Sequence, residues 1–288
     1  MRYAILTNPV SGTMDVEQKR STLKAVSKVL GADIYGLETK TPDEFSSCAT
    51  ELSLLFDVIV VAGGDGTFSQ VINAVDIAQT ALAFIPLGSG NAMKYALHYK
   101  GGLEKLAIRI LNGSDHAMDL IDCDGKRRAY MASMGLDSTV VRLRKRCRQK
   151  SEAGLITYLK TVPHAYFKCH KGFQVQAVVD GIRVTTGSTL SLMVVKQPYY
   201  GYGIKVVPEA SFCDGKLHIV MIGPGLFSFI FRAIRAFTTG KAIGRYFSGQ
   251  TLMVSLERPE TIQIDGSVGW TANNFQFSVL KRALKLRY

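Results

Sequence analysis

The sequence predicts an α/β domain with a parallel sheet over residues 1–122, followed by an antiparallel β-sandwich domain over residues 123–288. Up to about residue 120, apolar runs of strand length alternate with segments whose apolar residues recur at helical spacing. Such alternation is typical of a parallel sheet with helices on both faces. After residue 120 short strand-like runs dominate, and Asp180-Gly181 between two of them is typical of a hairpin turn. The pattern leaves open whether the C-terminal segment returns to the first domain.

The first domain begins with a predicted strand, Tyr3–Thr7, and a predicted helix, Asp15–Leu30, which Gly31 is expected to end. Thr41-Pro42-Asp43-Glu44 has the form of a capping box with proline at the first helical position, so a second helix is expected to start there. Two further apolar runs, Asp57–Ala62 and Ala81–Pro86, are predicted to be buried strands.

Each of these two later strands ends in a glycine-rich turn followed by a helix. Gly63-Gly64-Asp65-Gly66-Thr67 follows the first, and Thr67 and Gln70 are expected to cap the next helix reciprocally. Gly88-Ser89-Gly90-Asn91 follows the second. Both turns are expected at the carboxyl ends of parallel strands, where open α/β sheets bind ligands.

The second domain is expected to consist mainly of short strands. They are predicted at residues 129–134, 173–179, 182–186, 189–195, 205–207, 216–222, 251–256, 261–264 and 275–280. A helical stretch, Phe227–Thr239, and a basic stretch, Val140–Tyr158, interrupt this pattern.

The composition excludes several classes of protein. With 288 residues, 47% of them hydrophobic, the chain can form a substantial core and is not disordered. The five cysteines and five histidines lack metal-ligand spacing, which argues against a zinc site and favours reduced thiols in the cytoplasm. No run has the form of a signal peptide or a membrane span, so any membrane contact is expected to be peripheral. The net charge of +12 favours anionic partners: nucleotide, acidic membrane or nucleic acid.

The turn Gly63–Thr67 carries the strongest chemical signal. Glycines let the backbone approach a ligand closely, and the free N–H groups of a helix start suit phosphate. Asp65 places a carboxylate in the same turn. A carboxylate repels phosphate unless it holds a cation or handles a proton, so the combination indicates nucleotide chemistry. Considered without the accompanying motifs, Asp65 could simply be the N-cap of the following helix.

Further motifs accompany this turn in a fixed order, and together they resemble the diacylglycerol-kinase catalytic family, which includes sphingosine, ceramide and bacterial lipid kinases. The resemblance covers nearly the whole chain. Its motifs are Asn8-Pro9-Val10-Ser11-Gly12, Gly63–Thr67, Pro86-Leu87-Gly88-Ser89-Gly90-Asn91, Tyr199-Tyr200-Gly201-Tyr202-Gly203-Ile204-Lys205, Pro208-Glu209-Ala210, Asp214-Gly215-Lys216-Leu217 and Ile264-Asp265-Gly266.

The resemblance implies an ATP- and Mg²⁺-dependent lipid kinase, with an N-terminal nucleotide-binding domain and a lipid-binding β-sandwich. Asp65 matches the aspartate given the base or magnesium role, and Asp265 matches a late Asp-Gly motif that could help to hold the magnesium. Asp214 matches a ligand of a structural magnesium in bacterial relatives, and Asp137 a position that contacts the lipid headgroup. The positions that match nucleotide-contacting turns are Asn8, Gly63, Gly64, Asp65, Gly66, Thr67, Gly88, Ser89, Gly90 and Asn91.

The chain departs from the family pattern at three places. Ser69-Gln70 stands where the family usually has Asn-Glu, and Ser267 follows Asp265-Gly266 where a glutamate is usual. Asn91-Ala92-Met93-Lys94-Tyr95 lacks the usual Asp and Arg. Two alternatives remain beside the lipid kinase. The missing carboxylates allow a lipid- or nucleotide-binding protein with weakened catalysis. The Gly-Gly-Asp-Gly turn is shared with NAD kinases, although Gly88–Asn91 and the Tyr199–Lys205 motif argue against an NAD kinase.

Several of these residues also have purely structural interpretations. Asp214 and Asp265 each precede a glycine and could be turn residues, and Asp137 could serve packing alone. The basic run at residues 142–150 and the amphipathic stretch Phe227–Phe237 fit a peripheral contact with anionic lipid, but equally a solvated face and a core helix. We expect a lipid substrate, a cytoplasmic protein at the membrane surface and no nucleic-acid partner; a homodimer is possible.

Overall fold

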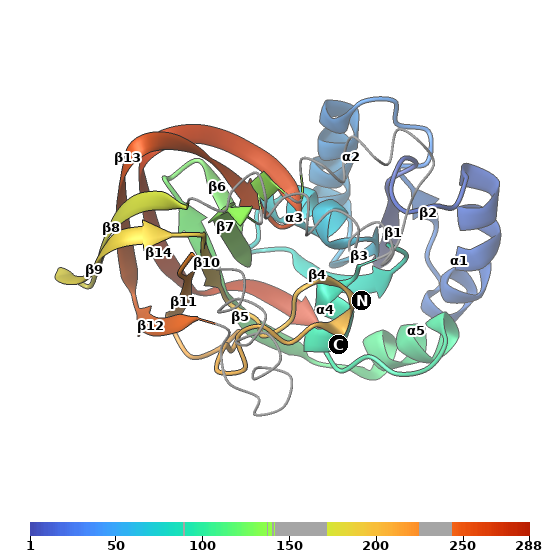
Figure 1. Ribbon diagram of the computed structural model, residues 1–288. Helices are drawn as coiled ribbons and strands as arrows, with labels where there is room; N and C mark the ends of the chain where they lie inside the picture. The colour runs from blue at the N-terminus through green and yellow to red at the C-terminus, as the bar shows by residue number, and fades with distance from the viewer. Residues whose placement is uncertain (89, 137, 140, 142–171, 225–243) are drawn as a thin grey trace. The chain divides into compact units, whose positions relative to one another are not determined.

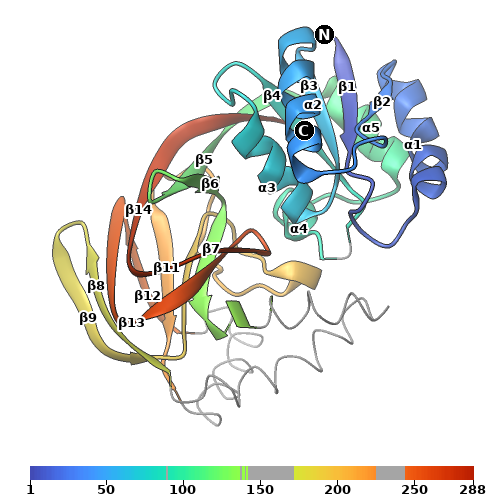
Figure 2. The same cartoon turned by 90° about the horizontal axis from the view of Figure 1, so that it is seen from above.

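The computed structural model describes the chain except residues 89, 137, 140, 142–171 and 225–243; Figures 1 and 2 show it from two sides. The described residues form two compact units. The N-terminal unit comprises Met1–Met118, Gly201–Gly203 and Arg282–Tyr288, and the C-terminal unit comprises Asp119–Tyr200 and Ile204–Lys281. The predicted basic run at 142–150 and the helical stretch at 227–239 lie outside the described residues.

A parallel sheet forms the centre of the N-terminal unit, as the sequence predicts. Hydrogen-bonded neighbours are parallel throughout, in the order β4 (Ala81–Pro86), β3 (Val58–Gly63), β1 (Tyr3–Thr7), β2 (Ile34–Tyr35). All residues of β1 and β3 are buried, since helices cover both faces. The short strand β2 carries too few apolar residues to give a recognisable pattern, and the sequence did not predict it.

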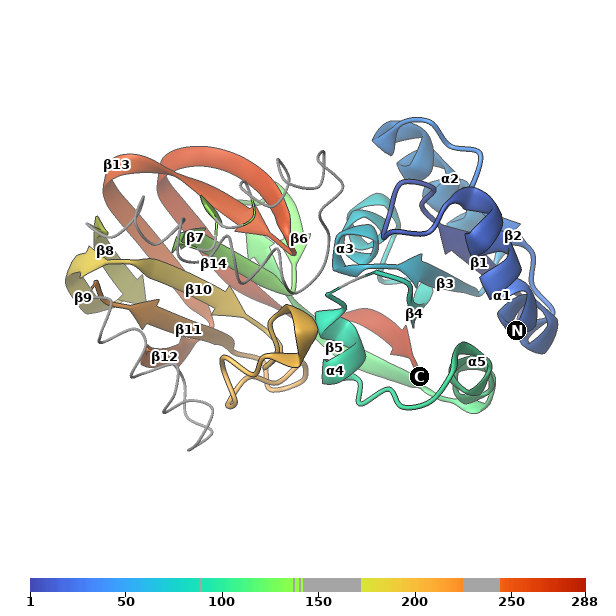
Figure 3. The same cartoon turned by 45° about the vertical axis from the view of Figure 1, so that its right-hand side comes forward.

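The helices of the N-terminal unit are α1 (Val16–Leu30), α2 (Pro42–Leu55), α3 (Asp65–Ala74), α4 (Ala92–Ala96) and α5 (Leu103–Asn112). Helix α1 packs beside α5 and α2 beside α3, and Figure 3 shows these two pairs on opposite faces of the sheet. The predicted helix ends are confirmed. Thr41 Oγ1 accepts from the Glu44 N–H at 3.1 Å, and Gly31 adopts the left-handed conformation (φ 58°) that ends α1.

The predicted reciprocal cap between Thr67 and Gln70 is wrong. Helix α3 begins two residues before Thr67, with Gly64 as its N-cap and no side-chain cap. The Gln70 amide instead donates to the Pro42 carbonyl at 2.7 Å and to Ser46 Oγ at 3.1 Å, so it joins α3 to α2.

The C-terminal unit is built mainly of antiparallel strands, as predicted. One run of hydrogen-bonded neighbours reads β12-β11-β10-β7-β13-β14. Strand β8 pairs with β13 and β9 with β8, while β5 pairs with β14 and β6 with β5. The strand bounds are β5 (Asp115–Cys123), β6 (Arg127–Ala129), β7 (Met131–Gly135), β8 (Phe173–Val179), β9 (Ile182–Thr189), β10 (Ser191–Val195), β11 (Leu217–Ile222), β12 (Arg245–Gly249), β13 (Thr251–Ile264) and β14 (Ser267–Arg287).

Three strand predictions need correction. The runs at 251–256 and 261–264 form one strand, β13, whose pairing with β14 shifts register between Ser255 and Glu260. Such an irregularity interrupts the alternation that marks a strand in the sequence. Lys205 forms only an isolated bridge with Tyr199, not a strand. Strands β5, β6 and β12 were not predicted, because polar residues occupy much of each.

The core of the C-terminal unit lies between its strand layers. Buried side chains from β7, β8, β10, β11, β13 and β14 form one hydrophobic cluster, including Met134, Leu192, Ile219 and Phe277. Figure 2 shows β13 and β14 as long, curved strands. The predicted hairpin at Asp180-Gly181 is confirmed: both residues have positive φ, 48° and 81°, which suits the turn between β8 and β9.

Among the described residues, no helix is long and apolar enough to cross a membrane.

The last residues of the chain complete the N-terminal sheet. The end of β14 pairs parallel with β4, with Lys285 opposite Ala81. Beside this pairing, the buried Arg287 guanidinium donates to the carbonyls of Ile110 and Leu111 at 3.0 and 3.3 Å, and pairs with Asp115 at 3.0 Å. Arg287 therefore satisfies carbonyls at the C-terminal end of α5, which have no partner within the helix itself.

We expect Arg287→Ala to lower the free energy of unfolding by about 2 kcal/mol, because it leaves buried carbonyls without a donor. Lys285→Ala, at an exposed position two residues earlier in the same strand, is the matched control and should change it by less than about 0.5 kcal/mol. Urea unfolding of both variants tests this, and equal losses would contradict the anchoring role of Arg287.

Candidate functional site

Two glycine turns touch at the carboxyl ends of the neighbouring strands β3 and β4. The N–H groups of Leu87 and Gly88 both donate to the Gly63 carbonyl, at 2.9 and 3.2 Å. A Cβ atom on Gly88 would lie 2.5 Å from the Gly64 Cα atom, which is too close for any side chain. Glycine is therefore required at this position to bring the two turns into backbone contact.

The Asp65 carboxylate connects the two turns. Asp65 is the first residue of α3, and its two carboxylate oxygens accept from the backbone N–H groups of Ala92 and Met93, at 2.9 and 3.2 Å. These two residues begin α4, so Asp65 caps the neighbouring helix and not its own. The carboxylate is only partly buried and is held in one orientation by two backbone donors.

The other two members of the first turn differ in exposure. Gly66 is exposed in the first turn of α3, whereas the Thr67 side chain is buried and occupies the space where a Cβ atom on Gly63 would lie, 2.7 Å from Thr67 Cβ. Gly63 thus makes room for Thr67, and the turn keeps its Gly66 side open.

Asn91 stabilises the second glycine turn, Gly88–Asn91, by a hydrogen bond inside that turn. Its backbone is left-handed (φ 43°), and its side-chain amide donates to the Gly88 carbonyl. Its Oδ1 atom is buried and has no hydrogen-bond partner in the described structure. A buried acceptor without a donor is costly, so this oxygen marks a position where a ligand donor or a water molecule would be stabilised.

The turn after β1 joins the same cluster of turns. Asn8 Oδ1 accepts from the Val10 N–H at 3.0 Å, so the side chain closes the turn. Gly12 has positive φ (71°), and a Cβ atom there would lie 2.8 Å from the Leu87 carbonyl oxygen. The structure thus brings the described nucleotide-binding candidates together in the N-terminal unit.

Lys19 supports this turn, and the sequence reading missed it. Its side chain is fully buried, and its ammonium donates to the carbonyls of Asn8, at 2.9 Å, and Pro9. Burial lowers the pKa of the Lys19 ammonium, an effect that the nearby Asp15 opposes. The sequence does indicate that this lysine is buried, because Lys19 lies on the apolar face of α1, four residues before the buried Leu23.

The segment Gly201–Gly203 also lies in the N-terminal unit, against the second glycine turn. A Cβ atom on Gly90 would be 3.7 Å from the Gly201 Cα atom, and one on Gly203 would be 2.7 Å from the Tyr95 ring. Close approach to Tyr95 of α4, together with its positive φ (76°), thus explains the glycine at position 203.

Asp265 lies in the C-terminal unit, at the turn between β13 and β14. It is 2% exposed, and its Oδ1 atom accepts from the N–H groups of Tyr130 and Met131 at 3.2 and 2.8 Å. The carboxylate therefore fastens this turn to the start of β7, which is the structural reading of the residue.

Asp214 lies in the same unit, before β11. Its carboxylate pairs with the Lys196 ammonium at 2.7 Å and with His218 Nε2 at 2.8 Å. Both oxygens therefore already face nitrogen groups, and one of these is a full positive charge. Such surroundings do not fit a magnesium ion, which requires several oxygen ligands and repels an adjacent ammonium. Ser89 and Asp137, the remaining candidates, lie outside the described residues.

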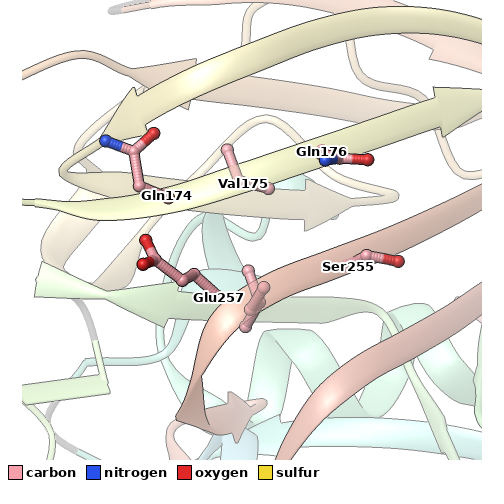
Figure 4. A pocket seen from close by; sticks show the side chains of 6 residues that line it. Gln174, Val175, Gln176, Ser255 and Glu257 are labelled. Atoms are coloured by element: carbon pink, nitrogen blue, oxygen red, sulfur yellow. The ribbon is translucent and has the colours of Figure 1, made fainter.

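A shallow hollow on the C-terminal unit contains none of the predicted site residues. It measures about 370 Å³ and lies between β8 and β13, where Gln174, Gln176, Ser255 and Glu257 line it (Figure 4). Val175 and Leu256 complete its lining.

Comparison with known proteins gives two family matches. The model of the diacylglycerol kinase catalytic domain matches residues 2–123, and that of the YegS C-terminal NAD kinase beta sandwich-like domain matches residues 130–285. A diacylglycerol kinase of Staphylococcus saprophyticus is 27% identical over 238 residues, which cover 77% of this chain and 72% of that protein. A probable lipid kinase YegS-like protein of Pectobacterium atrosepticum is 25% identical, covering 82% and 79%.

The fold has a close counterpart among solved structures. The crystal structure of a diacylglycerol kinase from Bacillus anthracis superposes with a TM-score of 0.75 at 19% identity, covering 100% of this chain and 96% of that one. At this identity the likeness shows the fold alone. It agrees with the predicted α/β and β-sandwich architecture.

We expect Gly88→Ala to lower the free energy of unfolding by about 1–3 kcal/mol, because the added methyl forces the two glycine turns apart. Gly102→Ala is the matched control in the same unit, since a Cβ atom there meets nothing within 4 Å. Urea unfolding compares the two variants. A Gly88→Ala protein as stable as its control would show that the turns need not touch.

Proposed function

The chain belongs to the family that joins a diacylglycerol kinase catalytic domain to a YegS-type C-terminal domain, and on this premise we propose that it is an ATP- and magnesium-dependent lipid kinase. Membership of this family supports a phosphotransferase activity. That the acceptor is a lipid and that the phosphate donor is ATP are our proposals. The acceptor would be a hydroxyl of a membrane-derived lipid, either diacylglycerol-like or sphingoid-like.

One observation carries this proposal: the Asp65 carboxylate is held between two touching glycine turns. Touching glycine turns with exposed backbone suit the phosphates of a nucleotide. A carboxylate held there by two backbone N–H groups needs no side-chain rearrangement before it acts, and such preorganisation favours catalysis. Asn91 Oδ1, the buried acceptor without a partner, supplies a further position for a ligand donor.

The transfer proposed for this site is a single displacement. The lipid hydroxyl oxygen forms a bond to the γ-phosphorus, the bond from that phosphorus to the β–γ bridging oxygen breaks, and ADP leaves. The hydroxyl proton passes to Asp65, which acts as the general base. In this scheme Lys19 acts indirectly, because its ammonium fixes the carbonyls of Asn8 and Pro9 and so the shape of the turn after β1.

The residues around Asp65 fit a magnesium ion that arrives with the nucleotide. The Asp65 carboxylate supplies hard oxygen atoms beside the glycine turns, and such atoms are the ligands that magnesium prefers. Bound magnesium would offset the charge of the phosphates.

A catalytically weakened binding protein is the second candidate, and two contacts favour it. Gln70, which stands at a usual glutamate position, is engaged with the Pro42 carbonyl and Ser46. Asp265, the late acidic candidate, is engaged with two backbone amides of its own unit. An NAD kinase is a third candidate, since the model matching the second half describes an NAD kinase-like sandwich.

Asp65→Asn should lower phosphate transfer from ATP to lipid by about 10²–10⁴-fold while the protein stays folded, because an amide cannot take the proton yet has nearly the shape of the carboxylate. The assay follows labelled γ-phosphate into diacylglycerol, monoacylglycerol, sphingosine, ceramide and NAD. Asp43→Asn, on the exposed first turn of α2, is the matched control and should keep full activity.

Each result of that assay selects one candidate. Label in a lipid that disappears with Asp65→Asn supports the kinase, and label in NAD replaces it with the third candidate. Calorimetric binding of ATP without transfer to any acceptor supports the weakened binding protein. Full transfer by Asp65→Asn would remove Asp65 from the catalytic role.

We also propose that the protein meets its substrate at an anionic membrane surface, in keeping with its net charge of +12. The protein should sediment with phosphatidylglycerol vesicles at low salt, much less with phosphatidylcholine vesicles, and be released as salt rises, because the attraction is electrostatic. Equal sedimentation with both vesicles, or none with either, would contradict this proposal.

A further inference from the structure

A buried lysine of the C-terminal unit, Lys196, is surrounded by oxygen atoms and has no part in the proposed phosphate transfer. Lys196 directly follows β10 and is 0% exposed. Its ammonium lies 3.0 Å from Asp119 Oδ2 and 2.7 Å from Asp214 Oδ1, and it also donates to the Lys216 carbonyl. The three N–H donors of the ammonium thus have three oxygen acceptors, two of them from carboxylates.

The carboxylates around Lys196 are themselves held in place. Asp119 Oδ2 also accepts from the Gly215 N–H at 2.7 Å, and Asp214 Oδ1 from the Lys216 N–H at 3.2 Å. The ammonium consequently links three parts of the unit: β5, which carries Asp119; the end of β10; and the loop before β11, which carries Asp214 and Lys216.

His218 contacts Asp214 from another side. Its ring lies 2.8 Å from Asp214 Oδ2 and 2.8 Å from the Tyr246 hydroxyl. The Lys196 ammonium, in contrast, lies within 3.0 Å of both Asp119 and Asp214, so it is the group that bridges the two carboxylates.

The same three oxygens would make a recognisable metal site if the ammonium were absent. Two carboxylates and a backbone carbonyl, converging on one point, are the hard donors that magnesium and calcium take. Removing a buried charge while its partners stay is strongly destabilising, so the oxygens left behind would favour any cation that could enter.

We propose that the Lys196 ammonium takes the place of a metal ion in the C-terminal unit. It occupies a site formed by Asp119, Asp214 and the Lys216 carbonyl that would otherwise suit a divalent cation. The unit therefore folds without a metal at this point, and removal of the ammonium exposes a divalent-cation site. This differs from the structural magnesium that the family resemblance implies for Asp214. It is also independent of the proposed kinase activity, because it concerns folding and not phosphate transfer.

The first test uses the wild-type protein without nucleotide. Its Tm should be the same in EDTA and in millimolar magnesium or calcium, since the site already holds its cation. A Tm that falls in EDTA and is restored by magnesium would overturn the proposal, because a metal would then be part of the native fold.

The second test uses Lys196→Ala. Its Tm in EDTA should fall by roughly 6–20 °C, as expected for a broken buried ion pair in a protein of this size. Magnesium, calcium or manganese should then raise the Tm in a concentration-dependent manner that the wild type does not show. Electron paramagnetic resonance with manganese alone should find one more bound ion per chain than in the wild type.

Three control variants isolate the cation site. Lys196→Met fills the space without charge and should be destabilised with no metal rescue. The double variant Lys196→Ala/Asp119→Asn should also lose the rescue, because one carboxylate ligand is gone. Lys216→Ala retains the backbone carbonyl and should behave as the wild type. A Lys196→Ala protein that no divalent ion stabilises, or that fails to fold even with calcium present, would overturn the proposed site.

Discussion

The backbone contact between two glycine turns is the constraint on which the candidate site depends. Gly88 lies against Gly64, and the Gly63 carbonyl accepts two N–H groups from the second turn. A side chain at Gly88 would separate the ends of β3 and β4. Because parallel strands bring their carboxyl ends to one edge, this contact gathers the backbone donors and Asp65 in one place.

Asp65 shows how one carboxylate can serve fold and chemistry together. It begins α3 but bonds to the first amides of α4, so the orientation of the candidate base is fixed by the turn that also faces the proposed nucleotide. Asp265 and Asp214 differ in this respect. Their carboxylates are engaged with backbone amides, an ammonium and a histidine within the C-terminal unit, where they hold strands and loops together.

Two buried lysines illustrate the same physical requirement. An ammonium inside a protein needs hydrogen-bond acceptors in place of water. Lys19 has the carbonyls of Asn8 and Pro9 as acceptors, and it shapes a turn of the candidate site. Lys196 meets it with two carboxylates and a carbonyl, and links a strand to a loop. The Lys19 ammonium lies at a turn that is suited to bind phosphate. The Lys196 ammonium instead balances the charge of two carboxylates inside the C-terminal unit.

Local pattern in the sequence determined the parallel strands, the caps at Thr41 and Gly31, the hairpin at Asp180-Gly181 and the choice of Asp65 and the glycine turns. These features arise from a few neighbouring residues, so a single chain displays them. Tertiary structure alone decided that Asp65 caps α4, that Gln70 bonds to α2, that the end of β14 joins the first sheet and that Lys196 pairs with Asp119 and Asp214. Each of these contacts joins residues distant in sequence, and periodicity and local propensity carry no information about such partners.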